Sequence, residues 1–112
     1  MPNYQIYIYT ASRLLELYKD NQRIRSYSIA VGKKSTPTPP GNYYIATKTM
    51  QPGGVFGTRW LGLSIPYYGI HGTNNPSSIG QAVSKGCIRM YNQDVEELYQ
   101  IVETETPVII QA

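Results

Sequence analysis

The chain has 112 residues, with ten Lys and Arg, seven Asp and Glu, one His and one Cys. A single Cys cannot form an intrachain disulfide, and one Cys with one His cannot complete a typical zinc site. We therefore expect residues 1–112 to form one soluble domain with its own hydrophobic core, without a metal or a cofactor.

The sequence predicts neither a membrane span nor a secretion signal. Its longest apolar runs, such as residues 108–110, are far shorter than the roughly 20 residues that cross a bilayer. Residues 1–4 lack the basic segment followed by an apolar segment that marks a signal peptide. We therefore expect no membrane insertion.

The charges are unevenly distributed. Residues 21–93 contain eight Lys and Arg and no carboxylate side chain, whereas the two ends together carry two Lys or Arg and all seven acids. A basic surface of this kind favours an anionic partner, although a solvated surface with ordinary scatter explains it equally well. No nucleic-acid-binding motif accompanies the basic residues, so nucleic acid is not expected as a partner.

The first half of the chain predicts strands and turns. Eleven Tyr, eight Pro and ten Gly favour these over a helical bundle. The predicted strands are residues 4–9, 13–18, 23–31 and 42–47, with a turn at 19–22 and a proline-rich loop at 32–41. Leu14, Leu15 and Leu17 also allow a helix, but the turn residues beside them favour a hairpin.

The second half combines short strands with one helix. Residues 67–71 and 107–111 are further predicted strands, and a polar loop follows at 72–78. Val95, Leu98 and Val102 recur at helical spacing and predict a helix over residues 93–103. Asp94 and Glu97 have the spacing of a capping box at its start. The fold class is therefore mainly β with one short helix near the C-terminus.

The only His and the only Cys both lie beside a glycine. An imidazole can take the proton of a thiol, so His71 and Cys87 together would form a base and a nucleophile. Lys85 and Arg89 add positive charge, which predicts a thiol pKa below about 8.5. Arg89 would also face the same side of a strand as Cys87. Taken singly, a lone Cys is more often a buried small hydrophobe, and a lone His a surface or satisfied core residue.

The sequence leaves the orientation of the imidazole open. No Asp or Glu lies in the basic stretch, so Asn74, Asn75 or a backbone carbonyl are the local candidates to orient it. The roles of Trp60, Tyr67 and Tyr68 are also open, because these side chains could line a substrate groove or belong to the core.

Three segments carry a recognisable pattern. The first is His71-Gly72-Thr73, then Ile79-Gly80, then Ser84-Lys85-Gly86-Cys87-Ile88-Arg89-Met90. The second is Val31-Gly32-Lys33 with Thr36-Pro37-Thr38-Pro39-Pro40-Gly41, and the third runs from Asn92 and Asp94 to Thr106-Pro107-Val108. Together they resemble the catalytic domain of the L,D-transpeptidase (YkuD-type) family over nearly the whole chain.

The resemblance implies a β-sandwich-like L,D-transpeptidase catalytic fold. It also implies that Cys87 is the nucleophile, that His71 is the general base, and that the Gly72 carbonyl orients the imidazole. Backbone N–H groups around Gly86 and Cys87 would form the oxyanion hole. The candidate substrate-contacting residues are Arg89, Ser84, Lys85, Gly86, Thr73, Trp60 and Tyr68. Lys85 stands where the commonest form of the motif has a His.

The function that the resemblance implies is cross-linking of bacterial peptidoglycan. Cys87 would be acylated by a stem tetrapeptide with loss of D-alanine, and the acyl group would pass to an amine of a neighbouring stem as a 3→3 cross-link. Water as acceptor would give an L,D-carboxypeptidase, a generic cysteine hydrolase would not transfer to amines, and an inert Cys87 would leave a cell-wall-binding module. We expect stem peptides as partners, a monomer, and a place in the cell wall or another extracytoplasmic site, spores included.

Overall fold

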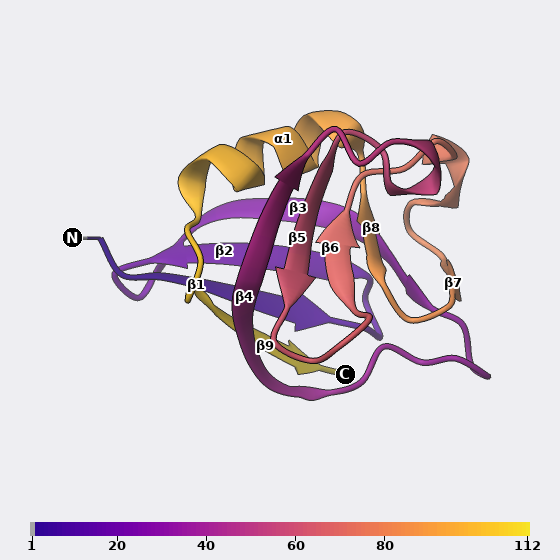
Figure 1. Cartoon of the computed structure of the whole chain (residues 1–112). Helices are drawn as coiled ribbons and strands as arrows, with labels where there is room; N and C mark the ends of the chain where they lie inside the picture. Colours follow the sequence, from indigo (N-terminus) through magenta and orange to yellow (C-terminus); the bar gives the residue numbers. More distant parts are fainter. Residues whose placement is uncertain (1) are drawn as a thin grey trace.

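The computed structural model describes residues 2–112, which form nine strands, one α-helix and two short 3₁₀ helices (Figure 1). In chain order these are β1 (Tyr4–Tyr9), β2 (Leu14–Lys19), β3 (Gln22–Gly32), β4 (Gly41–Met50), η1 (Gly54–Phe56), β5 (Arg59–Leu63), β6 (Gly69–His71), η2 (Pro76–Ser78), β7 (Ala82–Ser84), β8 (Ile88–Met90), α1 (Asn92–Ile101) and β9 (Pro107–Gln111). The predicted class, mainly β with one short helix near the C-terminus, is confirmed.

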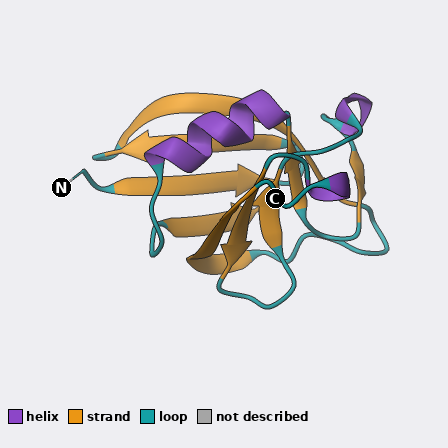
Figure 2. Ribbon diagram, turned by 45° about the horizontal axis from the view of Figure 1, so that its top comes forward, coloured by secondary structure: helices purple, strands orange, loops and turns teal. Residues whose placement is uncertain are grey.

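The strands form a closed barrel. Their order is β2-β1-β9-β4-β5-β6-β8-β3-β7, and an additional pairing of β2 with β3 joins eight of them into a ring, with β7 attached to β3. Closure is possible because β3 is 11 residues long: its first part pairs with β2, and Ile29 and Ala30 pair with β8. Figure 2 shows the two groups of strands running in different directions. The expected sandwich is therefore a mixed barrel whose two layers share β3 and β4.

The predicted hairpin of β2 and β3 is confirmed, and its turn explains the register. Lys19 pairs with Gln22, so the loop has only Asp20 and Asn21, whose φ values are 50° and 68°. Positive φ at both loop positions matches the right-handed twist of the flanking strands, and Asp and Asn tolerate that conformation better than most residues. The alternative helix over Leu14–Leu17 does not form.

A continuous apolar core fills the barrel and the space under α1. The fully buried side chains are Ile6, Ile8, Leu15, Leu17, Ile29, Ile45, Leu61, Ile70, Ile88, Met90, Val95, Leu98, Val102 and Val108. Helix α1 packs against β5 and β6 through its apolar face. Within residues 2–112, no helix combines the length and apolarity that a membrane crossing requires.

The two ends of α1 differ from what the local sequence pattern predicts. The helix begins after Tyr91, and no side chain caps it, so the predicted capping box of Asp94 and Glu97 is wrong. At the other end, Lys48 Nζ donates to the carbonyl oxygens of Tyr99 and Val102, both at 2.7 Å. A lysine there satisfies carbonyl groups that have no partner within the helix and complements the helix dipole.

Candidate active site

Parallel strands β6 and β8 bring the thiol and the imidazole together. Ile70 pairs with Ile88 and His71 with Arg89, so Cys87 lies just before the paired part of β8. Side chains alternate across a strand. Ile70 and Ile88 are fully buried in the core, whereas His71, Cys87 and Arg89 line a groove on the other face. The prediction that Arg89 faces the same side as Cys87 is confirmed.

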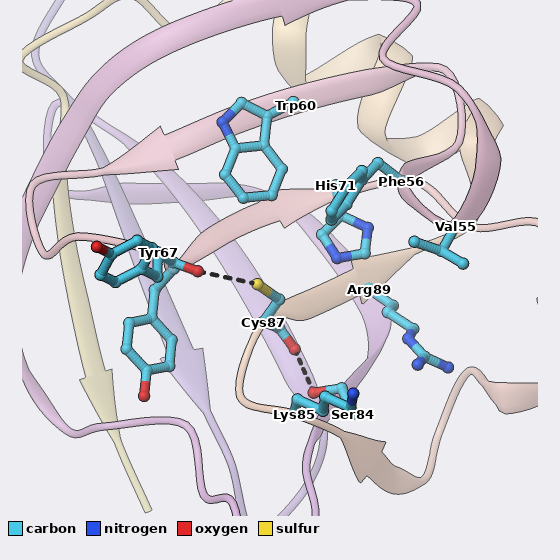
Figure 3. Close-up of a pocket in the computed structure, with 10 residues that line it drawn as sticks. Val55, Phe56, Trp60, Tyr67, His71, Ser84, Lys85, Cys87 and Arg89 are labelled. Carbon is cyan, nitrogen blue, oxygen red and sulfur yellow. Dashed lines mark hydrogen bonds between the residues drawn. The ribbon is translucent and has the colours of Figure 1, made fainter.

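The groove has a volume of about 570 Å³ (Figure 3). Its lining residues are Val55, Phe56, Trp60, Tyr67, Tyr68, His71, Ser84, Lys85, Cys87 and Arg89. Among the candidates, Trp60, Tyr68, Ser84, Lys85 and Arg89 therefore reach it, and Trp60 and Tyr68 are wall residues that are also partly buried. In the described part of the chain, no group of three or more His, Cys, Asp and Glu side chains could hold a metal ion.

Thr73 does not reach the groove. Its side chain is 3% exposed, and its hydroxyl accepts a hydrogen bond from the Asn75 backbone at 2.9 Å. Thr73 therefore shapes the loop after His71, and the structure does not support its expected contact with substrate.

His71 is held on three sides. Its Nδ1 donates to the Gly72 carbonyl oxygen at 2.5 Å. Its ring stacks on Trp60, with centroids 5.7 Å apart and planes at 16°, and meets Phe56 edge to face at 5.0 Å. Burial is the main cause that lowers the pKa of His71 to about 4; the bond to Gly72 opposes this and the charge of Arg89 adds to it. The imidazole is therefore neutral at pH 7, with its proton on Nδ1.

Cys87 carries a protonated thiol in this structure. Burial is the main cause that raises the pKa of the Cys87 thiol, and it outweighs both a backbone hydrogen bond from Gly69 and the charge of Arg89. The prediction of a thiol pKa below about 8.5 is therefore wrong for the resting groove. Among the hydrogen bonds of residues 2–112, the thiol donates to the Tyr67 carbonyl oxygen at 3.6 Å and not to the imidazole (Figure 3).

The turn before Cys87 is built by two hydroxyl groups. Ser84 Oγ donates to the Cys87 carbonyl oxygen at 2.6 Å and accepts from the Gly86 N–H at 3.0 Å. Thr38, 5% exposed, donates to the Gly86 carbonyl oxygen at 2.8 Å and accepts from the Gly32 N–H at 2.9 Å. The Gly86 N–H is thus engaged by Ser84 in the empty groove, and the oxyanion hole around Gly86 and Cys87 stays a prediction.

Gly86 itself is required by geometry. Its φ is 124°, a region that L side chains rarely adopt, and a Cβ there would lie 2.5 Å from Tyr68 Cε1. The close approach lets the Tyr68 ring form one wall of the groove directly beside the turn that precedes Cys87.

Two groove residues, Val55 and Phe56, were missed from the sequence, whereas Tyr67 was named there as a possible groove residue. Val55 and Phe56 lie in the η1 turn, where Gly53, Gly54 and Gly57 all have positive φ, and both side chains are exposed at the groove rim. The cluster of glycines indicates a loop with unusual backbone angles, but it does not indicate that this loop lies beside the groove. Tyr67, whose side chain is 95% exposed, adds its carbonyl group to the groove.

The fold and the site define a class of protein: a small mainly β barrel with one thiol and one imidazole in a common groove. The sequence model of the L,D-transpeptidase catalytic domain, YkuD, matches residues 3–110. The chain belongs to this family. YkuD of Bacillus subtilis (strain 168) is 53% identical over 107 residues, which are 96% of this chain and 65% of that protein.

Solved structures agree with this assignment. The catalytic domain from the E. faecium L,D-transpeptidase has a TM-score of 0.83 and 26% identity, over 99% of this chain and 98% of that one. The carbamoyl enzyme of Ldtfm has a TM-score of 0.86 and 25% identity, over all of this chain and 50% of that one. The chain spans about 65% of the length of the first two curated relatives it matches.

Proposed function

We propose that the chain is a cysteine L,D-transpeptidase of bacterial peptidoglycan, with Cys87 as nucleophile and His71 as general base. Membership of the family supports the reaction class. The observation that carries the two roles is the hydrogen bond from His71 Nδ1 to the Gly72 carbonyl oxygen. It keeps the proton on Nδ1 and leaves Nε2 free to accept the thiol proton in the same groove.

The first half-reaction acylates the thiol. Cys87 Sγ attacks the carbonyl carbon of the third stem residue while His71 Nε2 takes the thiol proton. The Sγ–C bond forms, the C–N bond to D-alanine breaks, and His71 gives its proton to the departing amine. The long hydrogen bond from the thiol to the Tyr67 carbonyl, 3.6 Å, is weak enough for the thiol to rotate toward the imidazole.

The second half-reaction releases the product. A side-chain amine of a neighbouring stem attacks the thioester, its proton passes through His71 to Sγ, and the 3→3 cross-linked stems leave. Phe56, Trp60 and Tyr68 line the groove with Cys87, and this aromatic lining would favour a peptide acceptor over bulk water at the thioester. Arg89 offers a cation to a carboxylate of the stem.

Intact-protein mass spectrometry tests acylation. Incubation with a disaccharide-free stem tetrapeptide should add the mass of the tripeptide acyl group and release one D-alanine per protein. Cys87→Ala should show neither, and His71→Ala should lose the adduct while keeping the thiol. If the wild-type protein forms no adduct and releases no D-alanine, the proposal fails.

Two additions separate the alternatives. A solved relative, Ldtfm, is described as an avibactam carbamoyl enzyme, so avibactam serves as a second acylating probe for Cys87. An amine acceptor added after tetrapeptide acylation should yield a cross-linked peptide. If only tripeptide and D-alanine accumulate, the enzyme is an L,D-carboxypeptidase or a more general cysteine hydrolase. Binding to wall sacculi without any adduct would instead identify a wall-binding module.

We further propose that residues 1–112 fold as one domain, that the protein acts as a monomer on peptidoglycan stem peptides, and that it acts in the cell wall. Light scattering tests the oligomeric state. Immunodetection in wall, cytoplasmic and spore fractions tests the location, and a signal confined to the cytoplasm would contradict it.

A further inference from the structure

One peptide unit links the imidazole to the start of α1. The carbonyl oxygen of Gly72 accepts from His71 Nδ1. The N–H of Thr73, at the opposite end of the same planar peptide, donates to Asn92 Oδ1 at 3.1 Å. His71, the Gly72–Thr73 peptide and Asn92 therefore form one continuous chain of hydrogen bonds.

The Asn92 carboxamide makes three hydrogen bonds in this region. Its Oδ1 also accepts from the Thr58 N–H at 3.2 Å, and its Nδ2 donates to the Thr73 carbonyl oxygen at 3.0 Å. The amide thus contacts both the loop that leads into β5 and the loop that follows β6. Three partners in two loops leave the carboxamide little freedom to turn.

Two glycines make room for this side chain. A Cβ built on Gly57 or on Gly72 would overlap Asn92 Oδ1. The carbonyl oxygen of the same Gly72 accepts the hydrogen bond from His71 Nδ1, so the residue that orients the imidazole also leaves room for Asn92. This fit explains the choice of residue at Gly72 better than a need for unusual backbone dihedrals, because only Gly57 of the pair has a positive φ.

We propose that Asn92 is a positioning residue for His71, acting through the Gly72–Thr73 peptide. It fixes the plane of that peptide, so that the Gly72 carbonyl points at Nδ1. By accepting from the Thr73 N–H it also polarises the carbonyl and strengthens its hold on the Nδ1 proton. A neutral amide relay would then do the orienting work that a carboxylate does in other nucleophile–base systems. The catalytic meaning of this relay rests on the proposed function.

The surroundings of His71 allow the relay to be measured. Of the side chains that line the groove with it, Cys87, Lys85, Arg89, Tyr67 and Tyr68 are titratable or charged, whereas Trp60 and Phe56, which touch the ring, are not. None of these is changed by a substitution at Asn92. A change in the tautomer or the pKa of His71 in an Asn92 variant would therefore report on the peptide relay.

Nitrogen-15 NMR of the free protein gives the decisive readout. In Asn92→Ala we expect the population with the proton on Nδ1 to fall and the Nε2-protonated tautomer to appear. Acylation by the stem tetrapeptide should slow by about tenfold to a hundredfold, the range for losing a hydrogen bond that supports a developing charge. In Asn92→Asp, a carboxylate at the end of the relay should raise the pKa of His71 by about one unit.

A matched control separates positioning from support of the fold. Glu96→Ala removes the partner of the Thr58 hydroxyl, 2.8 Å away, in the same helix and beside the same loop, but leaves the Gly72–Thr73 peptide untouched. It should leave the tautomer and the pKa of His71 unchanged. If Asn92→Ala does not fold, the nearly isosteric Asn92→Asp decides.

Unchanged nitrogen shifts and pKa of His71 in a folded Asn92 variant would overturn the proposal. The outcome is independent of the proposed function, because the NMR readout needs no substrate. A wild-type protein that is never acylated would refute the proposed enzymatic function. The proposed role of Asn92 would still be decided by the tautomer of His71.

Discussion

Acidification should destabilise this fold through one buried imidazole. His71 is 3% exposed, its ring stacks on Trp60 and meets Phe56 edge to face, and its pKa is lowered from 6.5 to about 4. Charging it inside the groove costs free energy that charging it in the unfolded chain does not. A difference of this size between the folded and unfolded states corresponds to about 3 kcal/mol of folding free energy.

The sign and the pH window follow from proton counting. Between pH 6.5 and about 4, the unfolded chain carries a proton on His71 that the folded chain does not. The unfolded state therefore binds more protons, and the free energy of unfolding falls as pH falls through this window. Below about pH 4 both states are protonated, and this contribution no longer changes.

Urea unfolding of the wild type and of His71→Gln between pH 7 and pH 4 measures the effect. Glutamine removes the titration, so the wild type should lose about 3 kcal/mol more than the variant on acidification. The carboxyl groups are shared by both proteins and cancel in this comparison, including Asp94, whose pKa burial raises. Parallel pH profiles for the two proteins would refute the assignment of a strongly lowered pKa to His71.

Three further predictions concern single side chains. Arg89→Gln removes a charge that favours the thiolate, so the pKa of Cys87 should rise further and iodoacetamide should alkylate it more slowly near neutral pH; an unchanged rate would contradict this. Thr38→Val removes the buried bond to the Gly86 carbonyl and should lower the free energy of unfolding by about 1–3 kcal/mol, with Thr38→Ser as control. Lys48→Met should raise amide exchange in the last turn of α1, and unaltered protection would count against its capping role.

The β2–β3 hairpin was predictable because the residues that determine it are neighbours in the sequence. Asp20 and Asn21 tolerate the positive φ that a two-residue loop needs, and they follow a segment with β-type composition. The closure of the barrel was not predictable in this way. It depends on the second half of β3 leaving β2 and pairing with β8, a partner that lies about 60 residues later in the chain and is marked by no local pattern.

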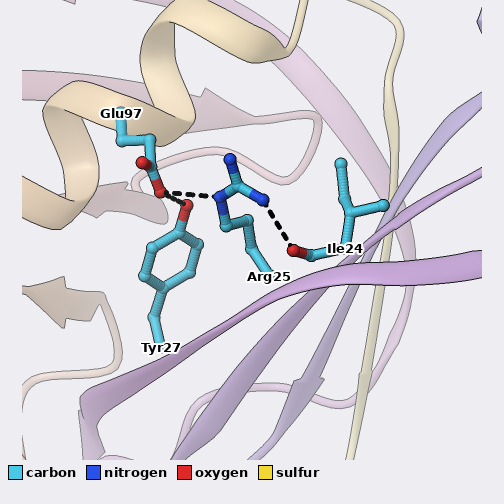
Figure 4. A network of polar contacts seen from close by, with 4 residues as sticks. All are labelled: Ile24, Arg25, Tyr27 and Glu97. Carbon is cyan, nitrogen blue, oxygen red and sulfur yellow. Dashed lines mark hydrogen bonds and ion pairs between the residues drawn. The ribbon is translucent and has the colours of Figure 1, made fainter.

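The capping box failed because tertiary contacts compete for the same side chains. Glu97 had the spacing to reach back to the helix start, but its carboxylate instead accepts from the Tyr27 hydroxyl and from Arg25 Nε, the latter at 3.3 Å (Figure 4). Both partners lie on β3. The side chain of Asn92, the first residue of α1, instead makes hydrogen bonds with the loop after His71. The spacing of polar residues alone cannot show whether a side chain bonds to the helix start or to another part of the fold.

The reactive pair illustrates the same limit for electrostatics. Lys85 and Arg89 are both visible in the sequence. In the structure the charge of Arg89 lowers the pKa of the Cys87 thiol, but burial of Cys87 has the larger, opposite effect and is set by the walls around it. The sequence could name Cys87 and His71 as the candidate nucleophile and base, but it could not give the protonation states of these two side chains in the empty groove. Those states required the packing of Phe56 and Trp60 on the imidazole.

Cys87 and His71 are both uncharged while the groove is empty. Burial disfavours both the thiolate and the imidazolium, so a preformed ion pair is unfavourable while the groove is empty. Arg89 lowers the pKa of both groups, which helps the thiol lose its proton but makes His71 a weaker base. An anionic substrate group bound at Arg89 would offset that charge and raise the basicity of His71 at the moment the substrate carbonyl arrives. The register places His71 opposite Arg89, which lies two residues after Cys87. In the proposed reaction this arrangement would couple substrate binding to proton transfer.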